Sequence, residues 1–158
     1  MSIKNAKKKH KIHGSMETRD LLALNGNPVW RVFASTPVSQ KTQTAIGLSG
    51  RKALYALTHD QGEFLHWREL FVTAHAAIHL AEKGYGQDLM EEFNGALTVA
   101  LNCRSRGSVG GSYYLKEEEA SKVTVLLDLH EQQLALAAKA DLAAAIIESY
   151  KRAGLNCS

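Results

Sequence analysis

The residues best suited to chemistry in this sequence are two histidines, His75 and His79, which stand four positions apart. In a helix this spacing places both imidazole rings on one face, an arrangement that helical metal sites use. Ala76 occupies the position of the glutamate in an H-E-x-x-H motif, so the usual general base is missing. Further ligands would have to come from His59, His66, Cys103 or the His130-Glu131 pair. One hypothesis is therefore a metal-dependent enzyme, and the alternative is a pair of half-buried packing residues.

No other residues form a recognisable catalytic group. A cysteine nucleophile needs a base within hydrogen-bond reach and an oxyanion site, and the sequence identifies neither for Cys103. We expect Cys103 to be a buried, inert thiol. The sequence also lacks G-x-S-x-G, the phosphate-loop motif G-x-x-x-x-G-K-[ST], and a G-x-G-x-x-G that follows a strand. We therefore name no catalytic residue and no cofactor.

The segment from Arg104 to Ser112 (R-S-R-G-S-V-G-G-S) is predicted to be the clearest internal loop, because glycine and serine dominate it. The segment contains two arginines, Arg104 and Arg106, and is followed in the sequence by Tyr113 and Tyr114. Such groups hold phosphates and stack on bases in nucleic-acid-binding proteins. The same composition also suits a solvated connection between helices, so both interpretations stay open.

The first 14 residues are predicted to be a flexible basic tail. Five of the 19 basic residues lie there with no acidic residue, which leaves 14 against 16 acidic residues in the rest of the chain. The lysines that matter for an anionic ligand are Lys7, Lys8, Lys9 and Lys11. Tail and loop together favour a second hypothesis, a nucleic-acid-binding accessory protein, although like charges also keep any terminus solvated.

The pattern of apolar residues predicts a mainly α fold, a compact bundle of four to six helices in one domain over residues 15–158. The helices are expected at residues 35–58, 63–83, 87–103 and 116–153. The last of these is too long for a compact body, so we expect a break near residues 139–141; one long helix in a homodimer is the competing possibility. At most one short extended segment is expected, at residues 29–33.

Length and composition are those of an ordinary globular protein, with 158 residues, 45% hydrophobic and 22% charged. Two cysteines are too few for a disulfide framework. The chain has no apolar stretch suited to a signal peptide or a membrane span. These observations together predict a cytoplasmic protein with no membrane contact.

The leading hypothesis is a non-catalytic helical protein that acts by binding a larger protein partner. An accessory or inhibitory factor of the kind that phages and plasmids encode would fit such a small chain, with homo-oligomerisation through the apolar C-terminal helices as an added possibility. Aromatic side chains dominate the binding energy of protein interfaces. The candidate anchors are Trp30, Phe33, Trp67 and Tyr85.

Overall fold

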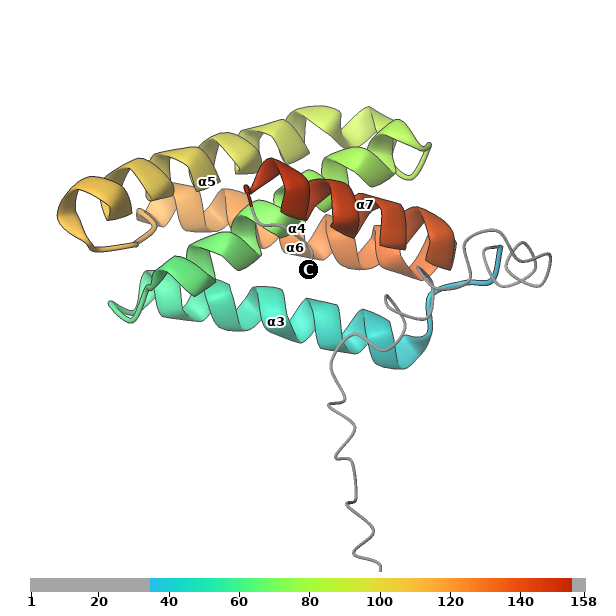
Figure 1. The fold of residues 1–158 in the computed structure, drawn as a ribbon, viewed down its shortest axis with the longest axis horizontal. Helices are drawn as coiled ribbons and strands as arrows, with labels where there is room; N and C mark the ends of the chain where they lie inside the picture. Colours follow the sequence, from blue (N-terminus) through green and yellow to red (C-terminus); the bar gives the residue numbers. More distant parts are fainter. Residues whose placement is uncertain (1–34, 155–158) are drawn as a thin grey trace, which may run out of the picture.

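The computed structural model describes residues 35–154. They form five α-helices and one short 3₁₀ helix: α3 (Gln40–Thr58), α4 (Phe64–Glu82), η1 (Gln87–Leu89), α5 (Met90–Gly110), α6 (Glu117–Leu136) and α7 (Lys139–Arg152). Within residues 35–154 there is no β-strand, and the β-type contact is one isolated antiparallel bridge between Pro37 and Ala138. The predicted fold, a mainly α, compact bundle of four to six helices, is therefore confirmed (Figure 1).

Helix α4 lies at the centre of the bundle and packs against α3, α5, α6 and α7. In Figure 1, α5 and α3 lie on opposite sides of α4, and α7 crosses in front of it. Eleven of the 19 residues of α4 are buried, because a helix that is apolar on most sides must be covered on most sides. Trp67 is 1% exposed and donates its indole N–H to the carbonyl of Ala100 on α5 at 2.9 Å.

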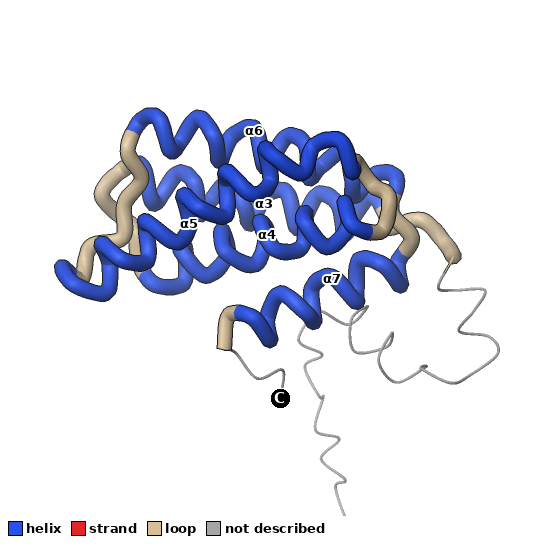
Figure 2. The backbone as a smooth tube through the Cα atoms, turned by 90° about the horizontal axis from the view of Figure 1, so that it is seen from above, coloured by secondary structure: helices blue, strands red, loops and turns tan. Residues whose placement is uncertain are grey.

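Helix α7 stands apart from the other four helices, on one side of them (Figure 2). Its buried residues are Leu142 and three with small side chains, Ala143, Ala145 and Ser149. A second apolar cluster forms there, separate from the main core of the other helices; its buried members are Val38, Ala76, Leu80, Leu134, Ala137, Leu142 and Ala145. Alanines on both helices allow a close approach of α7 to α4.

Helix α3 is continuous through Gly47 and Gly50, although glycine weakens a helix by about 1 kcal/mol relative to alanine unless another backbone packs closely against it. The close neighbour is α6. A Cβ at Gly50 would lie 2.6 Å from Cδ2 of Leu127, and one at Gly47 would lie 3.0 Å from Oε1 of Glu131. The missing side chains therefore let α6 pack tightly along α3.

The C-terminal region is two helices, as predicted, but the break falls at Ala137 and Ala138 instead of residues 139–141. Both alanines have extended backbone angles, although alanine is the best helix former. Tertiary contacts hold them there. Val38 donates its backbone N–H to the carbonyl of Ala137 at 3.3 Å, and Ala138 donates to the hydroxyl of Tyr85 at 3.2 Å. The alternative of one long helix is wrong.

The predicted loop from Arg104 to Ser112 is also wrong, because α5 continues to Gly110 and ends with Gly111 in a left-handed conformation at φ 72°. Glycine in a helix costs about 1 kcal/mol relative to alanine. Packing offsets that cost here, because the bare backbone of Gly107 contacts the ring of Tyr113, where a Cβ would overlap the ring. Local propensity has been overridden by tertiary contact.

Several predictions fall on residues outside 35–154: the basic tail of residues 1–14 with Lys7, Lys8, Lys9 and Lys11, and the extended segment with Trp30 and Phe33. They stay predictions.

Candidate interaction surface

The most distinctive surface of the described residues lies over the second half of α3 and the start of α4. Leu48 and Tyr55, seven residues apart on α3, are 54% and 56% exposed. They border an open depression of about 590 Å³, which we call the α3 surface. Its lining residues are Leu48, Arg51, Lys52, Tyr55, Ala56, Gln61, Glu63 and His66.

The helix register explains why these side chains face solvent. The buried residues of α3 include Gly50, Ala53 and Leu57, which point toward the core. Leu48 and Tyr55 stand about half a turn away from those positions, so the same register that buries one set exposes the other. Large apolar side chains that stay exposed together are typical of binding surfaces.

The Tyr55 side chain is held in one orientation. Its ring stacks on the imidazole of His59 with 3.9 Å between centroids and 14° between planes. Nδ1 of His59 is itself 2.9 Å from the carbonyl oxygen of Tyr55 and 3.0 Å from Oγ1 of Thr58. A ring that is already fixed loses little conformational entropy when a partner covers it.

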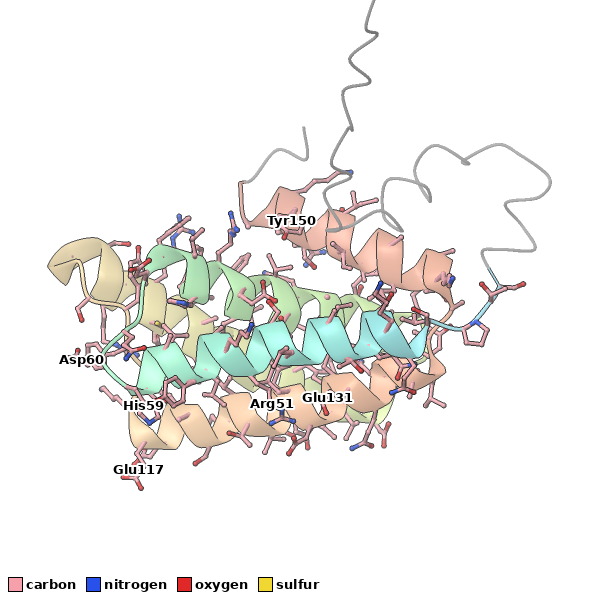
Figure 3. All side chains as sticks on the ribbon, turned by 90° about the horizontal axis from the view of Figure 1, so that it is seen from below. Arg51, His59, Asp60, Glu117, Glu131 and Tyr150 are labelled. Atoms are coloured by element: carbon pink, nitrogen blue, oxygen red, sulfur yellow. The ribbon has the colours of Figure 1, made fainter. Side chains whose placement is uncertain are left out.

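The turn beneath this surface is also fixed. Asp60 has a positive φ of 57°, and the backbone of Gly62 contacts the carbonyl oxygen of Tyr113 so closely that a Cβ at residue 62 would overlap it. His66 accepts a hydrogen bond at Nδ1 from the backbone N–H of Glu63 at 3.1 Å. Figure 3 shows His59 and Asp60 at the end of α3 that leads into this turn.

The charges along α3 differ in how they are paired. Arg51 points toward α6 (Figure 3) and pairs with Asp128 at 2.6 Å and Glu131 at 3.0 Å. Hydrogen bonding to Asp128 raises the pKa of Arg51 above its ordinary value. Lys52 is exposed and forms no ion pair with any residue of the described part. The α3 surface therefore offers one unpaired positive charge beside its apolar side chains.

His75 and His79 lie one turn apart on α4 and are half-buried. Nδ1 of His75 and Nε2 of His79 are buried without a hydrogen-bond partner, and the His75 ring packs edge-on to Phe71 with centroids 4.5 Å apart. Burial lowers the pKa of His75, and the positive charge of Arg152 lowers it further. Among the described residues, no group of three or more histidine, cysteine or carboxylate side chains converges as metal ligands do.

Arg106 is engaged inside the protein and does not present a free guanidinium group. It forms a two-pronged ion pair with Glu119 at 2.6 and 3.0 Å, and it donates to the carbonyl of Tyr114 at 2.6 Å. Burial raises the pKa of Glu119, but the hydrogen bonds from Arg106 and from the backbone N–H of Lys116 outweigh it and lower the pKa below its ordinary value. Arg106 thus joins the last turn of α5 to the start of α6.

Arg104, Tyr113 and Tyr114, also proposed for nucleic-acid contact, make ring contacts within the protein, although Arg104 and Tyr114 are exposed. The guanidinium of Arg104 lies 4.9 Å from the ring centroid of Trp67, and that of Arg106 lies 4.7 Å from the ring centroid of Tyr114. The ring of Tyr113 packs against Phe64 and Trp67, with centroids 6.2 and 6.5 Å away. These side chains therefore stack on one another or on other rings of the protein. Of the two tyrosines, Tyr113 is half-buried and Tyr114 is exposed.

Two of the proposed aromatic anchors have internal roles. Trp67 belongs to the core, and the hydroxyl of half-buried Tyr85 donates to Oδ2 of Asp141 at 2.8 Å, which ties the end of α4 to α7. Cys103 is 0% exposed, and burial raises the pKa of its thiol. Leu48, Lys52 and Tyr55 were not predicted as binding residues, although their i, i+4, i+7 spacing places them on one face of a helix.

None of the described helices is long and apolar enough to cross a membrane. Comparison of the chain with protein-family models, with curated proteins and with solved structures finds no match.

Proposed function

We propose that this protein is a non-catalytic helical factor that binds a larger protein partner through the α3 surface. The observation that carries the proposal is the joint exposure of Leu48 and Tyr55 around an open depression, with the Tyr55 ring held in place by His59. Tyrosine is among the residue types that dominate interface hot spots, and an exposed leucine beside it adds apolar area to the same surface. The accessory or inhibitory role is part of the same proposal.

The chemistry of the surface indicates what the partner presents. Tyr55 needs an apolar pocket with a hydrogen-bond acceptor or donor for its hydroxyl, and Lys52 needs an acidic group at the rim. The surface is a poorer support for a nucleic-acid ligand, because Lys52 is accompanied by Glu63 in the depression and by the Asp128 and Glu131 carboxylates next to Arg51.

The test is affinity purification of the tagged full chain from its native host, with nuclease treatment in one of two arms. The wild-type chain is compared with Leu48→Ala and Tyr55→Ala, which remove the two anchors. Leu101→Ala on α5 is the matched control, because Leu101 is 46% exposed and lies outside the depression.

A protein retained by the wild type and by Leu101→Ala, resistant to nuclease and lost with Tyr55→Ala, would support the proposal. Truncating a hot-spot residue costs about 2 kcal/mol or more, so the dissociation constant of the purified pair should rise about 30-fold. Retention that depends on nucleic acid, or that is equal in all variants, would refute the α3 surface as the binding site.

A further inference from the structure

The ring of His66 makes a hydrogen bond that only its neutral form can make. Nδ1 of His66 lies 3.1 Å from the backbone nitrogen of Glu63. A backbone N–H can only donate, so Nδ1 must be the acceptor and must carry no proton. The proton of the neutral ring is therefore on Nε2. A charged ring carries a proton on both nitrogens and cannot accept this bond.

This hydrogen bond caps the start of α4. Glu63 is the N-cap residue and His66 is the third residue of the helix, so the His66 side chain reaches back to the backbone N–H of the cap, as glutamate or glutamine does in a capping box. We call this contact the His66 cap. The first turn of α4 contains no acidic residue. A positive charge on His66 would therefore face the positive end of the helix dipole with no acidic side chain of that turn to balance it.

The charges around His66 do not favour a charged ring. His66 shares the depression of the α3 surface with Arg51, Lys52 and Tyr55 of α3 and with Glu63, and no lining residue comes from α5, α6 or α7. Two of these groups are positive and one is negative. Within residues 35–154, no ion pair joins the Glu63 carboxylate to the His66 ring. A proton taken up by His66 therefore gains no new partner in the described part of the chain.

His59, at the start of the same turn, has the opposite requirement. Its Nδ1 lies 2.9 Å from the carbonyl oxygen of Tyr55, and a carbonyl can only accept. Nδ1 of His59 must therefore carry a proton, which it does in the neutral ring of this form and in the charged ring alike. Proton uptake thus preserves the hydrogen bond of His59 and breaks that of His66.

We propose that the His66 cap is a pH-sensitive contact, formed when the ring is neutral and broken when the ring takes up a proton, which controls the order of the turn between α3 and α4 (residues 59–63). Histidine is the residue type that ordinarily changes charge between pH 5 and 8. Because Glu63 and His66 both line the depression, loss of the cap loosens one wall of the α3 surface. The effect on partner binding rests on the proposed function, whereas the cap itself does not.

Two substitutions at residue 66 test the cap. His66→Gln keeps an acceptor oxygen that does not titrate, and glutamine is a usual residue at this position of a capping box. His66→Ala removes the acceptor at every pH. His59→Gln is the matched control, because the glutamine amide can donate to the same carbonyl and no hydrogen bond of His59 depends on the neutral ring.

Urea titration at pH 8 and at pH 5 gives the unfolding equilibrium constant of each chain, which is divided by that of the wild type at the same pH. Loss of a capping contact changes such a constant about fivefold. For both His66→Ala and His66→Gln, we expect the ratio to fall about fivefold from pH 8 to pH 5, because the wild type alone loses its cap. At pH 8, His66→Ala should unfold more readily than His66→Gln. The ratio for His59→Gln should stay the same.

The position of the proton is measured separately. Long-range ¹H–¹⁵N NMR correlations at pH 8 report which ring nitrogen is protonated, and we expect Nε2 in His66 and Nδ1 in His59. A proton on Nδ1 of His66 would overturn the proposal. So would ratios for the two His66 variants that do not change between pH 8 and pH 5.

Neither measurement needs the partner, so failure to capture a partner would refute the proposed function and leave the His66 cap standing. With the captured partner, the dissociation constant should rise from pH 8 to pH 5 about fivefold more for the wild type than for His66→Gln, because the partner must order the turn again. Titration of the partner's own groups cancels in this comparison. An equal rise for both chains would refute the effect of the cap on binding.

Discussion

Replacing Gly107 with alanine should destabilise the protein, although alanine is the better helix former. Gly107 lies inside α5, where the sequence predicted a loop. The ring of Tyr113 packs against its backbone, and a Cβ at residue 107 would overlap the ring. That ring cannot simply swing away, because it also packs against Phe64 and Trp67.

Two opposing terms decide the size of the effect. Alanine gains about 1 kcal/mol of helix propensity over glycine, and inserting extra atoms into a packed site costs about 1–3 kcal/mol. The overlap involves a whole aromatic ring, so we expect a cost near the upper end. The free energy of unfolding should therefore fall by about 1–2 kcal/mol for Gly107→Ala, or about 2–8 °C in Tm for a chain of this size.

Gly95→Ala is the matched control in the same helix. A Cβ at Gly95 meets nothing within 4 Å, so the propensity gain stands alone and stability should rise by about 0.5–1 kcal/mol. Urea unfolding followed by circular dichroism measures both variants. Were Gly107→Ala neutral or stabilising, residues 104–110 would not be packed as a helix against Tyr113, and the correction to the predicted loop would be refuted.

Three further predictions concern the interior. Burial lowers the pKa of His130 in the folded state, so below pH about 6.5 the unfolded chain binds a proton that the folded chain does not. As the pH is lowered through this range, the free energy of unfolding should decrease by up to about 1.4 kcal/mol per pH unit, measured by denaturant titration at each pH. His130→Gln should reduce this pH dependence. Tyr85→Phe leaves the backbone N–H of Ala138 without its partner and should cost about 1–2 kcal/mol, with amide exchange rising first across α7. In a Cys157→Ser background, a thiol reagent should label buried Cys103 at least about a thousandfold more slowly than a small free thiol, and equal rates would contradict its burial.

The apolar periodicity predicts most accurately the helices whose start, end and buried face depend on residues within the helix itself. Helix α4 was expected over residues 63–83 and runs from Phe64 to Glu82, with Gly84 in a left-handed conformation after it at φ 104°. Its apolar positions and its terminating glycine lie within one stretch of chain, so the local sequence was sufficient to predict where the helix begins and ends.

The two helix boundaries that were predicted wrongly, the break between α6 and α7 and the end of α5, depend on contacts outside the helices. The break between α6 and α7 falls at two alanines, held extended by Val38 and Tyr85 from distant parts of the chain. The last turns of α5 contain glycines that a local scale penalises, and Tyr113 compensates from beyond the helix end. In both places a tertiary contact outweighs a propensity of about 1 kcal/mol. The partners of Ala137 and Ala138 are distant in the sequence, whereas Gly107 and Tyr113 are close in the sequence and their contact depends on how the chain turns after α5.

The same reasoning explains why the candidate site was missed. Residue type alone predicts Trp67 and Tyr85 as anchors, yet Trp67 belongs to the core and the Tyr85 hydroxyl ties the end of α4 to α7, whereas Tyr55 is the exposed ring. A binding residue must be both apolar and exposed, and exposure depends on which face of α3 the rest of the bundle leaves uncovered. Gly47 and Gly50 settle that, because their missing side chains bring α6 onto one side of α3 and leave Leu48, Lys52 and Tyr55 on another. The sequence therefore contained the signal for the surface in its glycines more than in its aromatic residues, since the glycines decide where the neighbouring helix packs.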